Sequence, residues 1–193
     1  MRRYIVALAF ALALPAAPAL VWAETASNRL AAPGPEHAWM TPLAGKWKVD
    51  MNVWPGPGAE PFAIPGLTAE REMILGGRYL REVLIGGDGT PLREATMGYN
   101  RLDGRFELVT VDIFEPGQMV YSGREGDTGD TDTVSMYGIS TEAGMGPEPT
   151  GRKRDLRFDF TIEDTGTNVQ RIYVRYPGGQ EFLFVEQRFT RQD

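Results

Sequence analysis

The chain has 193 residues, a formal net charge of −6 and no cysteine. A chain of this length can bury a hydrophobic core as one domain without disulfides, and the lack of cysteine excludes thiol nucleophiles and cysteine metal sites. The negative charge repels nucleic-acid phosphates and anionic lipid surfaces, so we expect no nucleic-acid partner.

The first 23 residues have the pattern of a signal peptide. Arg2 and Arg3 form a short positive start, and an apolar run follows over residues 4–14. Residues 21–23 suit cleavage after Ala23. The apolar run is shorter than the roughly 20 residues of a membrane span, which disfavours the alternative of an uncleaved anchor. We therefore expect a periplasmic or secreted protein with no stable membrane anchor after cleavage, which would change its charge from −6 to −8.

A short helical segment is expected to follow the leader. Residues 24–34 are rich in Ala, Pro and Gly and predict a flexible lead-in without regular structure. Pro35 suits a first helical turn, so residues 36–43 predict one or two turns of helix. Pro42 and Gly45 end this segment.

From Lys46 onward, apolar and polar residues alternate with a period of two, as in strands with one buried face. In residues 155–163, for example, every second side chain is Leu, Phe or Ile. The predicted strands are 46–54, 67–74, 78–85, 93–99, 105–114, 119–123, 133–139, 155–163, 168–176 and 181–191. Short turns rich in Gly, Asp and Pro join them. We therefore expect an all-β domain over residues 35–193, a single antiparallel up-and-down β-barrel of about ten strands.

The interior of such a barrel has two alternatives. Closing about ten strands leaves an interior wider than a small barrel filled by its own side chains, so it can hold a ligand. Large aromatic side chains can instead plug it. The candidates for plugging are Phe106, Phe114, Phe158, Phe160, Phe182, Phe184 and Phe189.

Several segments together carry a family resemblance. They are Pro35-Glu36-His37, Leu43-Ala44-Gly45-Lys46-Trp47, residues 69–80 with their Leu-Gly-Gly-Arg-Tyr-Leu motif, Met97-Gly98-Tyr99-Asn100, Phe106, Asp112 and Phe189-Thr190-Arg191. This set resembles an uncharacterised family of bacterial exported domains of unknown function, whose members are similar to calycin-type barrels such as lipocalins, fatty-acid-binding proteins and nitrobindins. The resemblance implies a barrel that can hold a pocket, and it implies no particular activity.

The resemblance also implies how one barrel end is closed. In calycin-type barrels the tryptophan that matches Trp47 lies at one end, often under an arginine of the last strand, so Gly45, Trp47 and either Arg188 or Arg191 are expected to close this barrel. A guanidinium over an indole ring contributes about 0.5–2 kcal/mol. Nitrobindins bind haem through a histidine late in the chain. His37 is the only histidine here, so we expect no haem, no other cofactor and no metal.

The polar residues around the third predicted strand are candidates for ligand binding. Arg78 and Glu82 share one strand face by parity, and Glu70 and Glu72 precede them. If this face points inward, the pair can orient a ligand carboxylate or hydroxyl. If it points outward, the pair is a surface ion pair worth at most about 1 kcal/mol. The alternation of apolar residues slightly favours the outward alternative.

Tyr99 and Asp112 complete the candidate ligand-binding residues, either as polar groups in a pocket or as turn-bonding residues.

Two loops each have two alternative interpretations. The acidic stretch 125–132 could hold calcium but lacks the EF-hand spacing, which favours a solvated turn. Residues 144–151 and the basic residues 152–154 predict a lid or docking loop, or a solvated turn that begins a strand.

The sequence contains no motif that fixes a reaction. It has no Gly-x-Ser-x-Gly elbow, no phosphate loop and no Ser/His/Asp set that could act together. We therefore expect a binding module that holds a small apolar or amphipathic molecule in the barrel. The alternatives are a structural or interaction module of the cell envelope with a filled barrel, and an enzyme that uses inward-facing polar residues.

Overall fold

The computed structural model describes residues 26–125, 132–142 and 150–193. The predicted signal peptide lies outside the described residues, as do most of the acidic stretch and most of the 144–151 loop. The predicted calcium-turn and lid alternatives are therefore not addressed by the structure.

The described residues form a closed barrel of ten antiparallel strands in sequential order. This confirms the predicted all-β, up-and-down architecture, and each strand overlaps one predicted from the sequence. The strands are β1 (Gly45–Val53), β2 (Phe62–Ile74), β3 (Tyr79–Ile85), β4 (Pro91–Asn100), β5 (Arg105–Asp112), β6 (Met119–Glu125), β7 (Thr133–Thr141), β8 (Lys153–Ile162), β9 (Thr167–Arg175) and β10 (Phe182–Arg191). The pairing of β1 with β10, from Trp47 opposite Arg191 to Val53 opposite Val185, closes the barrel.

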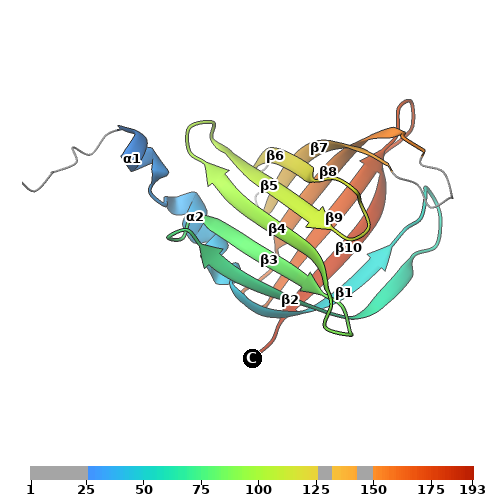
Figure 1. Cartoon of the computed structure of the whole chain (residues 1–193), viewed down its shortest axis with the longest axis horizontal. Coiled ribbons are helices and arrows are strands. Elements are labelled where there is room, and N and C mark those ends of the chain that lie inside the picture. The colour runs from blue at the N-terminus through green and yellow to red at the C-terminus, as the bar shows by residue number, and fades with distance from the viewer. Residues whose placement is uncertain (1–25, 126–131, 143–149) are drawn as a thin grey trace, which may run out of the picture.

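Helices lie at one end of the barrel (Figure 1). The predicted helical segment is present as α2 (Pro35–Met40) and the 3₁₀ turn η1 (Thr41–Leu43), and Pro35 occupies the first turn of α2. The prediction of no regular structure for residues 24–34 was wrong in part, because α1 (Ala26–Ala31) lies there. In the part of the chain that the structure describes, no helix is long and apolar enough to cross a membrane.

Strand β2 begins five residues earlier than predicted, at Phe62. Pro65 and Gly66 lie at a bulge within this strand. The pairing register with β1 shifts there, and Gly66 has a φ of +76°. A bulge can contain a proline, which cannot donate a hydrogen bond to the neighbouring strand, and it can contain a glycine in the left-handed region.

Aromatic and aliphatic side chains fill most of the barrel. Six aromatic residues are at most 3% exposed: Trp47, Phe106, Tyr121, Phe158, Phe160 and Phe189. Phe114, by contrast, is 66% exposed and does not plug the interior. The packed alternative for the interior is therefore largely correct. Any space for a ligand inside the barrel lies next to the buried polar side chains.

Candidate functional site

Three charged side chains lie inside the barrel on adjacent strands: Arg71 on β2, Glu82 on β3 and Arg93 on β4. They are 4%, 4% and 8% exposed. Arg71 and Glu82 are direct partners in the sheet register. The outward orientation slightly favoured for the Glu82 face was wrong, because Glu82 shares its inward face with the buried Leu80 and Leu84.

Glu82 is the centre of the hydrogen-bond network. Arg71 Nε donates to Glu82 Oε2 at 2.7 Å, and Arg93 Nη2 donates to Glu82 Oε1 at 2.5 Å. Gln170 Nε2 also donates to Glu82 Oε2 at 3.0 Å, and its own Oε1 accepts from Arg93 Nη2 at 3.0 Å. Asn168 Oδ1 accepts from Arg71 Nη1 at 3.0 Å. Both carboxylate oxygens of Glu82 are thus occupied by protein donors.

Aromatic rings surround Arg71. Its guanidinium carbon lies 4.0 Å from the ring centroid of Phe189, 5.1 Å from that of Trp47 and 5.5 Å from that of Phe160. Burial lowers the pKa of Arg71, and the nearby carboxylate of Glu82 opposes this shift. Cation–π contacts of this kind are worth about 2 kcal/mol when desolvated. The positive charge of Arg71 is therefore stabilised by both Glu82 and the rings.

Arg93 has a buried guanidinium nitrogen without a hydrogen-bond partner among the described residues. Its Nε and the hydroxyl of Thr110 on β5 are buried and have no hydrogen-bond partner among the described residues. Both residues line a cavity of about 20 Å³ inside the barrel, together with Glu82 and Gln170 on the polar side and Phe158 among the apolar walls. This volume holds about one or two water molecules.

The pKa of Glu82 gives a testable pH dependence. Burial alone would raise it, but Arg71 and Arg93 outweigh burial and hold it at about 2, below the usual 4.5. Because the folded pKa is lower than the unfolded one, the carboxylate stabilises the fold fully above pH 4.5 and loses this effect as the pH falls through about 2. The shift corresponds to about 3 kcal/mol.

We therefore expect the difference in unfolding free energy between wild type and Glu82→Gln to shrink as the pH falls from 4.5 towards 2. Urea denaturation at a series of pH values measures it. If the unfolding free energies of the two proteins change equally with pH across this window, the pH dependence does not come from Glu82.

The residues expected to close the barrel lie at its helical end. Trp47 is buried, and its Nε1 donates to Leu43 O at 3.0 Å. The Arg191 guanidinium carbon lies 4.4 Å from the indole centroid, and its Nη1 donates to Ala44 O at 3.0 Å. Gly45 has a φ of +132°, and a Cβ there would lie 2.6 Å from Arg191 Nη1. A glycine at this position thus admits the arginine that covers Trp47.

Arg188, the other arginine predicted for closure, does not take part. Position 188 has the opposite parity to Phe189 and Arg191, so its side chain lies outside the barrel. There Arg188 Nη1 donates to Glu163 Oε1 at 3.0 Å.

The structure does not bring the four predicted ligand-binding residues together. Only Glu82 lines the interior cavity. Arg78 and Tyr99 line a separate pocket at the helical end of the barrel. Asp112 has the turn-bonding role, because its Oδ1 accepts from the backbone N–H groups of Phe114 and Glu115, both at 2.8 Å.

Glu70 and Glu72, the acidic residues that the sequence placed near this site, lie outside the barrel. Glu70 pairs with Lys46 at 3.4 Å, and Glu72 pairs with Arg81 at 3.1 Å. The inward-facing residue between them is Arg71.

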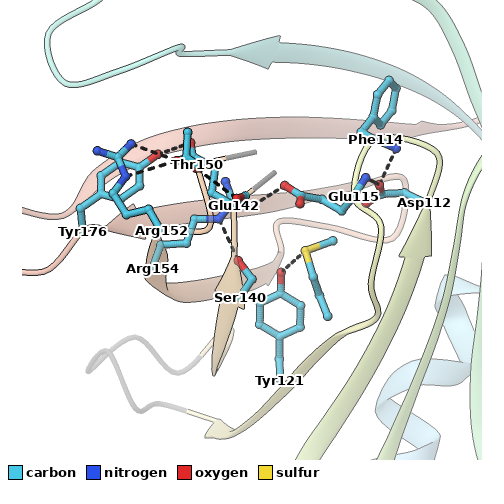
Figure 2. Close-up of polar contacts among 11 residues, drawn as sticks. Asp112, Phe114, Glu115, Tyr121, Ser140, Glu142, Thr150, Arg152, Arg154 and Tyr176 are labelled. Carbon is cyan, nitrogen blue, oxygen red and sulfur yellow. Dashed lines mark hydrogen bonds and ion pairs between the residues drawn. The ribbon is translucent and has the colours of Figure 1, made fainter. Parts of the chain in front are cut away.

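A second polar network crosses the opposite end of the barrel, as Figure 2 shows. Arg154 on β8 is buried, and its guanidinium binds Glu115 of the β5–β6 loop and Ser140 of β7, the latter at 2.8 Å. Next to it, Glu142 accepts from Arg152 at 3.0 Å and from the hydroxyl of Tyr176 at 2.8 Å. The basic segment 152–154 is therefore not simply a solvated turn, because Arg154 ties β7 and β8 to the β5–β6 loop.

Sequence reasoning missed Arg71 and Arg93 as site residues, together with Gln170. The sequence does contain a signal for an inward-facing Arg71. Arg71 follows Leu67 and Ala69 at spacings of two, which places a charged residue on an apolar face. The pairing across strands, however, depends on a register that the sequence alone does not fix.

No metal centre is apparent in the described ranges, since no group of three or more His, Cys, Asp or Glu residues is placed to hold an ion. His37 is buried, and its Nδ1 accepts from Gly34 N at 3.0 Å. It thus has the packing and capping position typical of a structural histidine.

Comparisons with known proteins identify the family but no activity. The family model described as "Protein of unknown function (DUF1579)" matches residues 32–191. The crystal structure of Rv2717c from M. tuberculosis is similar, with a TM-score of 0.52, 20% identity, and coverage of 84% of this chain and 100% of that one; this likeness shows the fold. No curated protein matches the chain in sequence. The chain belongs to the DUF1579 family of proteins of unknown function.

Proposed function

We propose that this protein is an exported binding protein that holds a small monoanion inside its barrel, beside Arg93 and Thr110. The observation that carries the proposal is the pair of buried polar atoms, Arg93 Nε and Thr110 Oγ1, that have no partner among the described residues and belong to residues lining the same small cavity. Export rests on the signal-peptide pattern of the first 23 residues.

The charge of the interior supports an anionic ligand. Arg71 and Arg93 carry two positive charges, and Glu82 carries one negative charge, so the buried cluster has a surplus of one positive charge. A buried charge without compensation costs several kcal/mol. An anion beside Arg93 would neutralise this surplus. Glu82 would oppose it weakly, because both of its oxygens already accept hydrogen bonds from arginines.

The size of the cavity defines the ligand class. Pockets for drug-sized molecules measure about 300–1,000 Å³, whereas this cavity measures about 20 Å³. A fatty acid or another long amphipathic molecule therefore does not fit the interior as it stands. The proposal is accordingly limited to monoanions of a few heavy atoms, such as formate or bromide.

The aromatic packing of the interior favours a second candidate function. In this alternative the barrel is a filled structural module of the envelope, and water occupies the cavity. Water would satisfy Arg93 Nε and Thr110 Oγ1 without balancing the charge. The two candidates therefore differ in whether an anion competes with water at this position.

A formate titration followed by amide NMR tests the proposal. At constant ionic strength, we expect saturable shifts of the Ala95, Leu108 and Thr110 amides in the wild type. Arg93→Met should abolish these shifts, because it removes the donor and the surplus charge. Thr110→Val keeps a similar shape and should weaken binding about tenfold, as expected for a lost hydrogen bond to a charged group.

Arg81→Met serves as the matched control, because Arg81 is an exposed arginine on the outer face of β3. It should leave the formate shifts unchanged. Shifts that do not saturate, or that persist in Arg93→Met, would leave only the water-filled alternative.

A further inference from the structure

We infer that a second binding site, for an aromatic monocarboxylate, lies outside the barrel in a rim pocket beside Arg78. The rim pocket measures about 290 Å³, which is close to the lower size of metabolite pockets. Its lining includes His37, Arg78, Tyr79, Tyr99, Arg101 and Glu107. These residues come from α2, the β2–β3 turn, the start of β3, the end of β4, the β4–β5 turn and β5.

The rim pocket contains one arginine, Arg78, that forms no ion pair within the described residues. Among the described residues, no carboxylate lies within ion-pair distance of Arg78, whose guanidinium carbon is 5.5 Å from the ring centroid of Tyr79. Glu107 is the acidic residue of the lining. It already accepts from Arg105 at 2.9 Å and from Asn100 at 3.2 Å. The charge of Arg78 is therefore available to an anion that enters the rim pocket.

Arg101 fixes one wall of the rim pocket. Its Nη1 donates to the carbonyl oxygens of Arg29 at 2.9 Å and Ala32 at 3.1 Å. Both acceptors are neutral carbonyls, and they hold the end of α1 on the β4–β5 turn. The Glu36 carboxylate lies near the same guanidinium, since a Cβ on Gly34 would be 3.0 Å from Glu36 Oε2 and 3.1 Å from Arg101 Nε. The same contacts place Leu30 and Ala31 along the rim pocket as an apolar wall.

The charged groups around the rim pocket also affect the pKa of His37. Burial lowers the pKa of His37; Glu36 raises it, and Arg101 and Arg78 lower it further. His37 is therefore neutral near pH 7 and does not itself supply the cation. The selectivity for an anion therefore rests on Arg78.

The rigid rings of the lining favour an aromatic ligand. Tyr99 packs edge-on against His37 and Phe106, with centroid distances of 6.3 and 4.9 Å. Tyr79 lies so close to Gly98 that a Cβ there would be 2.4 Å from its ring. Because packing fixes both tyrosine rings, they can receive a flat ligand ring with little loss of side-chain freedom. A carboxylate on that ring would then lie in the field of Arg78.

Benzoate, with benzamide as its neutral isostere, provides the test. We expect saturable benzoate binding to the wild-type protein, followed by the ligand's NMR line width and by ring-to-ring NOEs to Tyr99. Arg78→Gln should weaken binding at least tenfold, because it removes a charge-assisted contact. Arg175→Gln, an exposed arginine at the opposite barrel end paired with Asp155, should leave binding unchanged.

Equal binding of benzamide and benzoate, retention of benzoate binding in Arg78→Gln, or no binding at millimolar benzoate would each overturn the inference. The rim pocket and the interior cavity are distinguishable in the same experiments. Arg93→Met should leave benzoate binding intact, and Arg78→Gln should leave the formate shifts at Thr110 intact.

Discussion

Glu82→Gln is expected to lower the unfolding free energy at pH 7 by about 3–5 kcal/mol. The substitution keeps the shape of the side chain but leaves Arg71 and Arg93 buried without a negative charge between them. Breaking a buried ion pair from one side is far more costly than losing a surface pair. Urea denaturation of the purified variant measures the effect.

Glu94→Gln is the matched control for this prediction. Glu94 binds Arg81 through two hydrogen bonds of 2.8 and 3.1 Å, but the pair is exposed on the outer face. Its loss should cost at most about 1 kcal/mol. A double variant adds a second check. Adding Arg93→Met to Glu82→Gln should recover stability if uncompensated charge causes the loss, whereas a further loss would contradict that cause.

Trp47→Ala is expected to lower the unfolding free energy by about 3–5 kcal/mol. The substitution leaves a void at the helical end of the barrel. It also removes the Nε1 hydrogen bond to Leu43 and the ring that both Arg71 and Arg191 contact. Chemical denaturation followed by far-UV circular dichroism measures the change.

Phe114→Ala is the control for Trp47, because the ring of Phe114 is 66% exposed. Truncating such a surface ring should change stability by no more than about 0.5 kcal/mol. Trp47→Phe should lie between the two, since it keeps an aromatic face for the arginines but not the hydrogen bond to Leu43. If Trp47→Ala costs no more than Phe114→Ala, the tryptophan does not stabilise the closed end.

Most of the fold could be predicted because strand periodicity is a local property. Alternation from Lys46 onward and the Gly, Asp and Pro turns between runs were enough to locate all ten strands. The start of β2 was missed because Pro65 and Gly66 carry the same local signal in a bulge as in a turn. Helix α1 spans only six residues, too few to show a helical periodicity, and the Ala, Pro and Gly content of residues 24–34 favoured an irregular segment.

The site was less predictable because it depends on which face of each strand points inward. Both faces of β3 carry apolar residues: Leu80 and Leu84 point inward, and Val83 and Ile85 point outward. The alternation of residue types therefore did not decide whether the Glu82 side chain points into the barrel. Closure then brings residues 71, 82, 93, 168 and 170 together from distant parts of the chain. The cavity volume depends in turn on how the aromatic rings pack, and no sequence pattern specifies that packing.

Anomalous diffraction from crystals soaked in sodium bromide tests the anion-binding account most directly. Bromide is small enough for the interior cavity, and its anomalous signal distinguishes it from water. We expect a peak within hydrogen-bond distance of Arg93 Nε and Thr110 Oγ1, absent from Arg93→Met crystals treated in the same way. Ordinary water density at that position, with no anomalous signal in wild-type crystals, would contradict the account.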